Sequence, residues 1–451
     1  MAKRILVIGG LAAGPSAASK AVRTNADVEA VLFEQGEHIS YGMCEVPYYI
    51  SGEVQEKGLI AYTPASLKEK RGVDVRILHK VEEIDPGKKK IRIRDLKEGR
   101  TREESYDRLI VATGSRPRSI GVEGEHARNV FTVKSLDQGL QIKKYIEQEK
   151  PRRAVIIGGG YIGMEMADAL RSLNLEVTIL HRHSLPMAGL ERGTREEVRE
   201  RLEKHGVTFV AHAKTEGFVL GKNQTVTHVV TSNGSFEADL VIVSMGVVPN
   251  SEIAKNAGVS VGKRGGILTD QRQQTNLDHI YAAGDCCEVK NLVTNTWMYI
   301  PLATTASRAG WVAGENAAGG KAIFRGVVRA IAVRVFDLEV AQVGISADEA
   351  KGADLDPVLE TITAWSRVGI MLGSKKVTIT TITDRKSKRL LGANLFGEEG
   401  AVLRANTLAV AIQQKMTINE VQQLDLAYSP PFTPLWDPIL VAANATARKI
   451  R

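Results

Sequence analysis

Two stretches of the chain share the same succession of apolar and glycine-rich positions. Residues 4–8 and residues 154–157 are short apolar runs, and each is followed by a glycine turn and by residues that predict a helix. Each helix leads to a second apolar run, over residues 28–33 in the first copy and 176–180 in the second. A strand, a glycine turn, a helix and a second strand form the βαβ unit that binds dinucleotides. The pattern therefore predicts an α/β fold with two dinucleotide sites.

The two glycine turns differ in completeness. The second turn matches the full G-x-G-x-x-G motif, at Gly158, Gly160 and Gly163. The first turn keeps Gly9 and Gly14 but has Leu11 at the middle position. Glycine at these positions allows a tight turn and lets a pyrophosphate approach the N-terminus of the helix. One such motif is weak evidence, whereas two in the correct context favour dinucleotide binding over coincidental glycine turns.

The residues after each second strand predict which nucleotide each unit prefers. Glu34 ends the first unit, where a carboxylate accepts hydrogen bonds from the hydroxyls of an unphosphorylated ribose. The equivalent position of the second unit is His181, followed by Arg182 and His183, so positive charge replaces the carboxylate. A 2′-phosphate fits such a site, which favours NADPH over NADH. The alternative is an exposed basic turn that accepts either nucleotide.

Three later apolar strands also end in turns of small residues. They lie within residues 106–115, 238–246 and 280–285, and their turns contain Thr113, Gly114, Gly246, Gly284 and Asp285. Ligands of a parallel sheet bind at the C-terminal ends of its strands, so these residues are candidates for cofactor contacts.

The order of these segments predicts three domains. The chain leaves a first nucleotide-binding domain (residues 1–117 and 250–325), builds a second one (residues 118–249) and returns. From residue 326 to residue 451 strands dominate and no nucleotide motif recurs. This region is predicted to be an α+β domain used for dimerisation or for covering a site.

Composition narrows the class of partner. With 451 residues, of which 43% are apolar and 25% charged, the chain can form about two to four globular domains. The net charge of +8 admits nucleic acid, a membrane surface or anionic small ligands. The densest basic cluster, residues 88–94, alternates with isoleucine as on the exposed face of a strand. Neither a zinc-finger spacing nor an RNA-binding aromatic signature occurs, which argues against nucleic acid.

The chain shows no sign of a membrane or secretory segment. The longest apolar run, around residues 240–248, is far shorter than the roughly 20 residues that span a bilayer. The first residues lead directly into a strand without a secretory signal pattern. We therefore expect a cytoplasmic protein without a membrane partner.

One of the three cysteines has a context that suggests redox chemistry. Cys44, Cys286 and Cys287 are too few for a disulfide framework, and no Cys or His stands at metal-ligand spacing. Gly42 and Pro47 bracket a turn that predicts a short helix with Cys44 near its N-terminus, where the dipole favours the reactive thiolate. A buried structural cysteine is the alternative at position 44. The adjacent Cys286 and Cys287 are interpreted as buried packing residues.

Six segments together carry a family resemblance. They are residues 9–14, the segment from Cys44 to Tyr49, and residues 112–114, 158–163, 284–285 and 426–437. On these motifs the chain resembles the flavin-dependent pyridine nucleotide-disulfide oxidoreductases over essentially its whole length. It is most similar to their single-cysteine branch, which contains coenzyme A-disulfide reductases and NAD(P)H persulfide or polysulfide reductases. The resemblance implies FAD held by Gly9, Gly14, Glu34 and Asp285, and NAD(P)H held by Gly158, Gly160 and Gly163 with Tyr161 near the nicotinamide.

The resemblance also implies a reaction. Cys44 becomes the sole redox thiol beside the flavin, because two-cysteine relatives carry their second cysteine where this chain has Tyr49. The implied acceptor is a small disulfide, persulfide or polysulfide, with coenzyme A as a candidate thiol. Relatives form homodimers in which a C-terminal tyrosine of one subunit donates a proton in the other's active site, which corresponds to Tyr428 here. Core packing beside Phe432 and Trp436 is the alternative for Tyr428.

Three departures from the family pattern leave the acceptor open. Glu45 stands where relatives usually have glycine, and its carboxylate raises the thiol pKa if it lies close. Ile370 and Met371 replace a tyrosine pair common in coenzyme A-disulfide reductases, which favours persulfides or polysulfide. Ala12 stands where oxidases and peroxidases of the superfamily carry a histidine, so a dedicated peroxidase is not expected. The alternatives are a flavin-direct NAD(P)H oxidase or quinone or metal reductase, and a redox-sensing flavoprotein of low turnover.

Overall fold

The first glycine turn lies at the centre of a parallel sheet. The computed structural model describes residues 3–450. The strands of this sheet, in spatial order, are β18 (Ile280–Ala282), β7 (Arg108–Val111), β1 (Lys3–Ile8), β2 (Val28–Phe33) and β3 (Asp74–Arg76). All neighbours in it pair in parallel, so their carboxyl ends share one edge.

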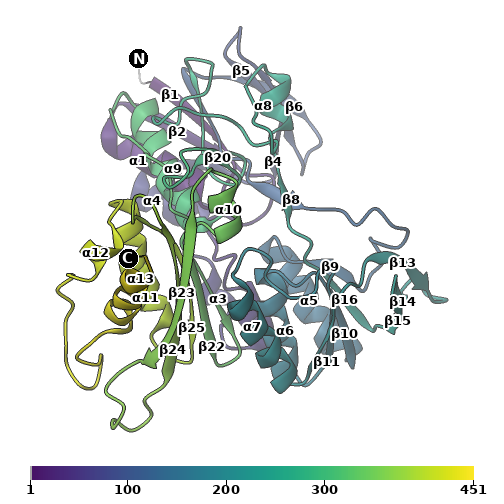
Figure 1. Ribbon diagram of the computed structural model, residues 1–451. Helices are drawn as coiled ribbons and strands as arrows, with labels where there is room; N and C mark the ends of the chain where they lie inside the picture. Colours follow the sequence, from purple (N-terminus) through teal and green to yellow (C-terminus); the bar gives the residue numbers. More distant parts are fainter. Residues whose placement is uncertain (1–2, 451) are drawn as a thin grey trace.

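Two helices pack closely against each other on this first sheet. They are α1 (Ala13–Thr24), which follows the glycine turn, and α9 (Ala303–Ala317), which comes from the returning part of the chain. A Cβ atom at Gly310 would overlap the backbone of Ala13, and one at Gly314 would overlap that of Ala17. The absence of side chains at these glycines allows the two helices to touch (Figure 1).

The second glycine turn lies in a sheet with the same strand order. Its strands are β9 (Val130–Thr132), β16 (Leu240–Val243), β10 (Arg153–Ile157), β11 (Glu176–Leu180) and β12 (Val207–Val210), again all parallel. Its helices are α5 (Leu136–Glu149), α6 (Tyr161–Ser172) and α7 (Arg192–Lys204). The expected pair of Rossmann-like units is confirmed, and the chain is built on one duplicated arrangement.

The C-terminal region is an antiparallel sheet covered by helices. Its strands, in order, are β21 (Ile331–Val335), β22 (Leu338–Gly344), β25 (Leu390–Gly397), β24 (Lys376–Asp384) and β23 (Pro357–Trp365). Its helices are α10 (Ala347–Lys351), α11 (Ala401–Gln413), α12 (Ile418–Val421) and α13 (Pro438–Ile450). Segregation of strands and helices confirms the α+β class. Figure 1 shows this region at the lower left, below the first sheet.

Small antiparallel elements decorate both nucleotide-binding units. The three-stranded meanders are β4 (His79–Asp85), β5 (Lys90–Asp95) and β6 (Thr101–Ser105), and β13 (Thr215–Leu220), β14 (Val226–Thr231) and β15 (Gly234–Glu237). Two short pairs, β8 (Ser115–Pro117) with β17 (Val247–Pro249) and β19 (Val289–Lys290) with β20 (Trp297–Met298), complete the strands. Because β8 and β17 flank the second unit, their pairing joins the points where the chain enters and leaves it.

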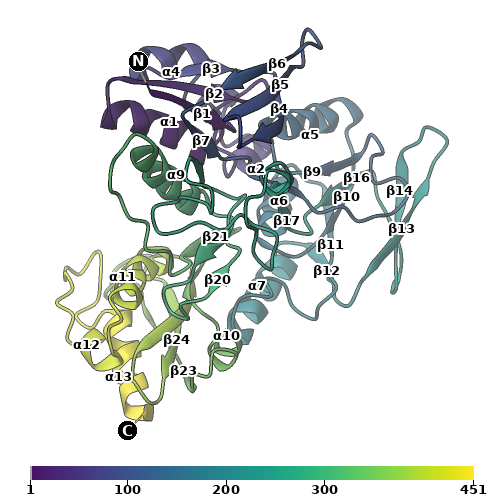
Figure 2. The ribbon, with the colours of Figure 1, turned by 90° about the horizontal axis from the view of Figure 1, so that it is seen from above.

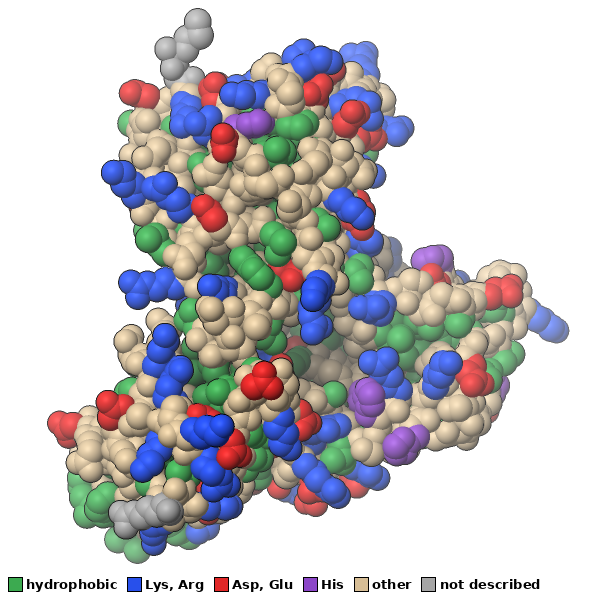
Figure 3. Space-filling model, turned by 45° about the horizontal axis from the view of Figure 1, so that its top comes forward, with side chains coloured by type: hydrophobic (Ala, Val, Ile, Leu, Met, Phe, Trp, Pro, Cys, Tyr) green, Lys and Arg blue, Asp and Glu red, His purple; other side chains and the backbone are tan. Residues whose placement is uncertain are grey.

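The basic cluster around residues 88–94 lies partly on β5, as its alternation indicated. Ile91 and Ile93 are buried, whereas Arg92 and Arg94 point to solvent and lie near acidic side chains of β4. On the face shown in Figure 3, Lys and Arg side chains are spread among acidic ones without forming one continuous patch. None of the helices between residues 3 and 450 is both long and apolar enough to cross a membrane.

The segment that carries Cys44 leaves its own sheet at α2 and returns to it at α4. It contains α2 (Val46–Ser51), α3 (Glu56–Leu59) and α4 (Pro64–Arg71), whereas the remaining short helix α8 (Glu252–Asn256) follows the second unit. Val46, Tyr49 and Ile50 are buried in one apolar core with residues of α5 and α6. Figure 2 shows α2 beside α6 near the middle of the molecule. The domain boundaries at residues 117, 250 and 325 remain predictions, but α2 is in contact with the second unit.

Candidate active site

The first glycine turn brings the backbone to the carboxyl ends of three neighbouring strands. Gly9 has φ +110°, and a Cβ there would overlap the carbonyl oxygen of Ala112 at the end of β7. A Cβ at Gly14 would overlap the carbonyl oxygen of Gly9 itself. The turn can therefore form only with glycine at both positions. Thr113, Gly114, Gly284 and Asp285 follow β7 and β18, so the sheet places them at the same edge.

Glu34 holds this turn through hydrogen bonds to the backbone. Its carboxylate accepts from the N–H of Gly10 at 2.7 Å and from the N–H of Gly36 at 2.8 Å. These bonds fix an anionic group just beyond β2, which is where the ribose of a dinucleotide lies in this fold. The cradle and the carboxylate fit FAD.

Asp285 is held by polar groups from two other segments. Its carboxylate pairs with Lys134 Nζ at 2.9 Å and accepts from Ser115 Oγ at 3.0 Å. The contact with Lys134, which follows β9, links the two nucleotide-binding units. Thr113 Oγ1 donates to the carbonyl of Asn250, and Asn250 Nδ2 donates back to the carbonyl of Thr113 at 2.9 Å. The predicted candidates Thr113 and Asp285 therefore lie at the junction of the units.

The second glycine turn repeats the first with an open middle position. Gly158 has φ +112°, and a Cβ there would crowd the carbonyl oxygen of Ser244 after β16. A Cβ at Gly163 would overlap the carbonyl oxygen of Gly158, whereas a Cβ at Gly160 would meet nothing within 4 Å. Open space at the start of α6 suits a pyrophosphate at the helix N-terminus. Gly246, with φ +88°, follows the neighbouring strand β16.

Tyr161 begins helix α6 directly after this turn. Its hydroxyl lies 3.5 Å from Gln342 Oε1 of the C-terminal domain. Burial raises the pKa of Tyr161 to about 12, so the phenol stays protonated at neutral pH. The side chain bridges the second unit and β22, and its role near the nicotinamide remains a prediction.

His181 occupies the place that Glu34 has in the first unit. The Gly159 N–H donates to His181 Nδ1 at 3.1 Å, as the Gly10 N–H donates to Glu34. Burial, with a smaller effect of His183, lowers the pKa of His181 to about 4. The ring is therefore neutral at pH 7, and its buried Nε2 has no hydrogen-bond partner among the described residues.

The expected positive charge at this position needs a correction. His181 contributes a polar ring without charge, because burial opposes its protonation. Arg182 is exposed, and its Nε donates to His183 Nε2 at 3.1 Å. The charge that distinguishes this site from the first one comes from the arginine.

Cys44 lies two residues before helix α2 and is exposed to solvent. Its position near the helix N-terminus is confirmed, but the expected preference for thiolate is not. The pKa of Cys44 is raised, although part of the side chain reaches solvent. The first cause is desolvation, because neighbouring protein atoms displace water around the thiol. The carboxylates of Glu165 and Glu45 raise the pKa further, while Lys134 opposes them. A helix of six residues provides a weak dipole, so desolvation and the carboxylates set the direction of the shift. The expected effect of Glu45 is confirmed, since its carboxylate lies against Gly42 in the same turn.

Glu165 is a member of this site that the sequence patterns did not reveal. It lies on α6, two residues after Gly163, and burial raises its pKa to about 7. Arg334 lowers that pKa and Asp168 raises it, both to a smaller degree than burial. The sequence signal that could have revealed Glu165 is an acidic residue between two apolar ones, Met164 and Met166, which are fully buried in the structure.

Tyr428 lies on the loop between α12 and α13 and is 49% exposed. Phe432 and Trp436 on the same loop are 77% and 58% exposed, so they do not form a core around Tyr428 within one chain. The loop that carries Ile370 and Met371 adjoins this one, because the Val368 N–H donates to the carbonyl of Pro430 at 3.3 Å. Among the described residues, neither Tyr428 Oη nor Cys44 Sγ has a hydrogen-bond partner, and no such bond joins them. Cys286 and Cys287 are buried, with their sulfurs 3.8 Å apart.

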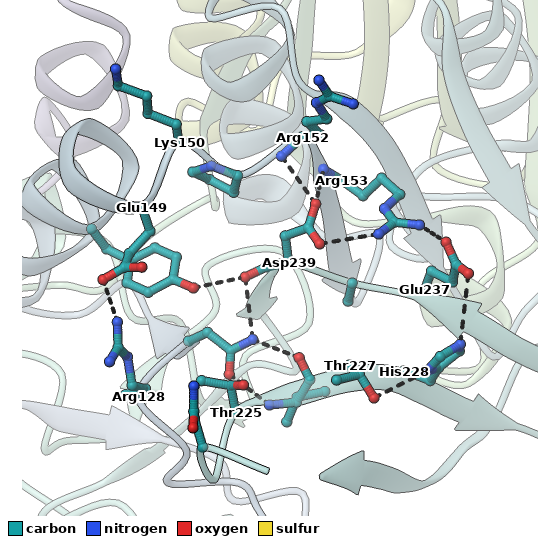
Figure 4. A pocket seen from close by; sticks show the side chains of 16 residues that line it. Arg128, Glu149, Lys150, Arg152, Arg153, Thr225, Thr227, His228, Glu237 and Asp239 are labelled. Carbon is teal, nitrogen blue, oxygen red and sulfur yellow. Dashed lines mark hydrogen bonds and ion pairs between the residues drawn. The ribbon is translucent and has the colours of Figure 1, made fainter. Parts of the chain in front are cut away.

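A separate cavity of about 680 Å³ lies at the other edge of the second sheet (Figure 4). Asp239 accepts from the backbone N–H groups of Arg152 and Arg153 at 3.0 and 2.9 Å, which ties β16 to β10. Arg128 pairs with Glu149 across it. The cavity lies at the amino ends of β10 and β16, away from the glycine turns.

Comparison with known proteins decides the family. Residues 3–310 match the family model described as pyridine nucleotide-disulphide oxidoreductase, and residues 331–438 match the dimerisation domain of that family. The chain belongs to this family. It is accordingly an FAD-dependent oxidoreductase that uses NAD(P)H, and its C-terminal region is a dimerisation domain.

Several relatives resemble the chain over nearly its full length. A Pyrococcus horikoshii protein named NAD(P)H coenzyme A polysulfide/persulfide reductase is 33% identical, with 98% of each chain covered. The structure of an NAD-dependent persulfide reductase from A. fulgidus is 35% identical with a TM-score of 0.96, covering 99% of this chain and 83% of that one. The structure of reduced Bacillus anthracis CoADR-RHD is 32% identical with a TM-score of 0.96, covering 100% and 81%.

Proposed function

We propose that the protein reduces a small disulfide, persulfide or polysulfide through Cys44, with NADPH as the preferred reductant. The observation that carries this proposal is the placement of Cys44. It is the exposed one of the three cysteines, and it precedes a helix that packs on the second nucleotide-binding unit. The relatives from Pyrococcus horikoshii and A. fulgidus are named for persulfide or polysulfide reduction.

Bound FAD would supply the route by which an electron pair passes from NADPH to sulfur. The Cys44 thiolate attacks one sulfur of the acceptor, and the bond between the two acceptor sulfurs breaks as the other sulfur leaves as a thiolate. Cys44 then carries the first sulfur in a mixed disulfide or a persulfide. Two electrons return Cys44 to the thiolate and release that sulfur, which takes up a proton. The glycine turns, Glu34 and Asp285 position the cofactors for this exchange.

The proton donor belongs to a second copy of the chain in this proposal. We infer a homodimer in which the partner's Tyr428 completes the site of Cys44. The dimerisation domain supports this inference, as does a surface on which Tyr428, Phe432, Leu435 and Trp436 are exposed. An apolar surface of this kind is typical of a face that a partner covers.

The acceptor class follows from the loop beside Tyr428. Ile370, which is 93% exposed, and Met371 replace the tyrosine pair of coenzyme A-disulfide reductases. Without those hydroxyls the loop offers an apolar surface, which favours a persulfide or polysulfide over coenzyme A disulfide. Coenzyme A remains a candidate carrier of the persulfide. The cytoplasmic location stays a prediction.

The test compares Cys44→Ser with Cys287→Ala, which removes a buried thiol that is not exposed to an acceptor. NADPH consumption is measured without oxygen, using a persulfide, polysulfide and coenzyme A disulfide in turn. We expect the Cys44 variant to lose turnover with all three while NADPH still bleaches its flavin, and the control to keep both. Retained turnover in Cys44→Ser would remove the thiol from the mechanism and favour direct transfer from the flavin. Slow turnover of the unaltered protein with every acceptor, despite full flavin reduction, would favour a redox sensor.

A further inference from the structure

Arg334 connects the C-terminal domain to the segment that carries Cys44. It lies on β21 and makes two hydrogen bonds to the carboxylate of Glu53, at 2.5 and 3.0 Å. Its guanidinium centre lies 4.8 Å from the ring centroid of Tyr48 in α2, within the range of a cation–π contact. Its Nε also lies 3.3 Å from the carboxylate of Asp168 in α6. One side chain therefore joins parts of three domains.

These contacts matter because α2 cannot be stable alone. It has six residues, no side-chain hydrogen bond at its N-cap and a glycine with φ +91° at its C-cap. Isolated helices of this length are unstable in water, so tertiary contacts must hold it. Its buried face packs on α5, where a Cβ at Gly139 would overlap Val46. Arg334 holds the opposite side through Tyr48 and the residue Glu53 just beyond the helix.

Arg334 is also a main cation in a region with many carboxylates. The titratable and charged groups that face Cys44, Tyr48 and this side of α6 are Glu45, Glu53, Lys134, Glu165, Asp168, Asp285 and Arg334. Arg334 lowers the pKa of Tyr48, Glu165 and Asp168, in each case against a larger effect of burial. Glu165 in turn is the strongest charged influence on Cys44.

We propose that Arg334 is a positioning residue for the redox cysteine: it locks helix α2, which follows Cys44, against helix α6. Arg334 acts through Tyr48, Glu53 and Asp168 and does not touch the reacting sulfur. The proposal rests on the proposed redox role of Cys44, but its test does not require turnover. The dimerisation domain thus adjusts the thiol site of its own chain as well as contacting a partner.

The chain offers a matched control in Arg201. This arginine of α7 also joins the second unit to the C-terminal domain, with Nη1 at 2.7 Å from Asp337 and 3.3 Å from Glu398. Neither carboxylate is among the groups that act on Cys44. Removal of Arg201 therefore costs an ion pair between the same domains without changing the surroundings of the thiol.

The experiment measures the rate of Cys44 alkylation by iodoacetamide from pH 5 to pH 10 in the flavin-loaded protein, with the adduct located by mass spectrometry. In the unaltered protein the ionisation of Glu165 near pH 7 opposes ionisation of the thiol, so the rate should rise less steeply through that region. Arg334→Met should move this inflection to higher pH, because Glu165 loses the cation that favours its charged form. Arg334→Lys should shift the inflection less than Arg334→Met, because lysine keeps a positive charge. Glu165→Gln should abolish the inflection, and Arg201→Met should leave it unchanged.

Turnover provides the second readout. With a persulfide acceptor we expect Arg334→Met to lower kcat about tenfold while the rate of flavin reduction by NADPH stays within about twofold. An inflection that stays in place in Arg334→Met, or that moves equally in Arg201→Met, would overturn the proposal. If Cys44→Ser retains turnover but the inflection moves as expected, the proposed function fails while the role of Arg334 stands.

Discussion

The two glycine turns of this protein share one backbone arrangement but differ in the acceptor that holds it. Both lie at the centre of parallel sheets with the same strand order. In the first, the charged carboxylate of Glu34 accepts from the Gly10 N–H, and in the second the neutral ring of His181 accepts from the Gly159 N–H. Both turns thus use an acceptor just beyond the second strand, a carboxylate in the first unit and a neutral imidazole ring in the second.

The units also differ in the segment that comes after the second strand. In the second unit residues 181–191 lead directly to α7, whereas in the first unit residues 34–63 form an insertion with Cys44, α2 and α3. The apolar face of α2 lies in the core of the second unit. The insertion therefore places a thiol from one unit beside residues of the other.

The largest expected effect comes from replacing the first glycine of each turn. Gly9→Ala and Gly158→Ala should each cost about 2 kcal/mol or more, because alanine is strained at positive φ and its Cβ meets a backbone carbonyl. Gly9→Ala should lose nearly all of its flavin, whereas Gly158→Ala should keep its flavin and lose reduction by NADPH. The measurements are flavin absorbance per chain and stopped-flow bleaching, with Gly193→Ala on α7, where a Cβ meets nothing within 4 Å, as control. Loss of FAD from both variants would contradict separate sites.

Exchanging the two acceptors is expected to have the next largest effect. Glu34→Gln should weaken FAD binding about tenfold to a hundredfold, since it removes a charged acceptor of two backbone bonds. His181→Glu should make the second site resemble the first and lower the ratio of kcat/KM for NADPH to that for NADH. An unchanged ratio would show that the acceptor does not select the nucleotide.

A smaller effect is expected from Arg182, which provides the charge at the second site. Arg182→Ala should raise KM for NADPH about tenfold and leave KM for NADH nearly unchanged, because only NADPH carries the 2′-phosphate. The difference should shrink as salt is added. Lys150→Ala, an exposed cation at the opposite edge of the sheet, is the control. Equal effects on both nucleotides would support the alternative of an exposed basic turn.

The smallest expected effect concerns the insertion. Glu45 raises the pKa of Cys44, so Glu45→Gln should lower that pKa and increase the thiolate fraction at pH 7. Alkylation of Cys44 at pH 7 should become about twofold to fivefold faster, and the gain should vanish at a pH above the thiol pKa. Glu56→Gln, a carboxylate of α3 that does not act on Cys44, is the control. A slower reaction in Glu45→Gln would mean that Glu45 assists the thiol.

Local sequence was sufficient for the fold class and for much of the site. The two βαβ units, the glycine positions and Glu34 were predictable because each depends on a strand, a turn and a helix that are close in sequence. The position of Cys44 before a short helix followed from Gly42 and Pro47. The charge state of His181 did not follow, because it depends on burial that distant segments create. Glu165 and Arg334 were missed for the same reason.

The sequence by itself determined that this chain forms two dinucleotide units and carries one cysteine in a redox context. Only the tertiary structure decided that the insertion packs on the other unit, that His181 is neutral and that Arg334 links a distant domain to α2. The physical reason is that backbone turns depend on neighbouring residues, whereas the protonation of a side chain depends on every charge and apolar surface that folding brings near it.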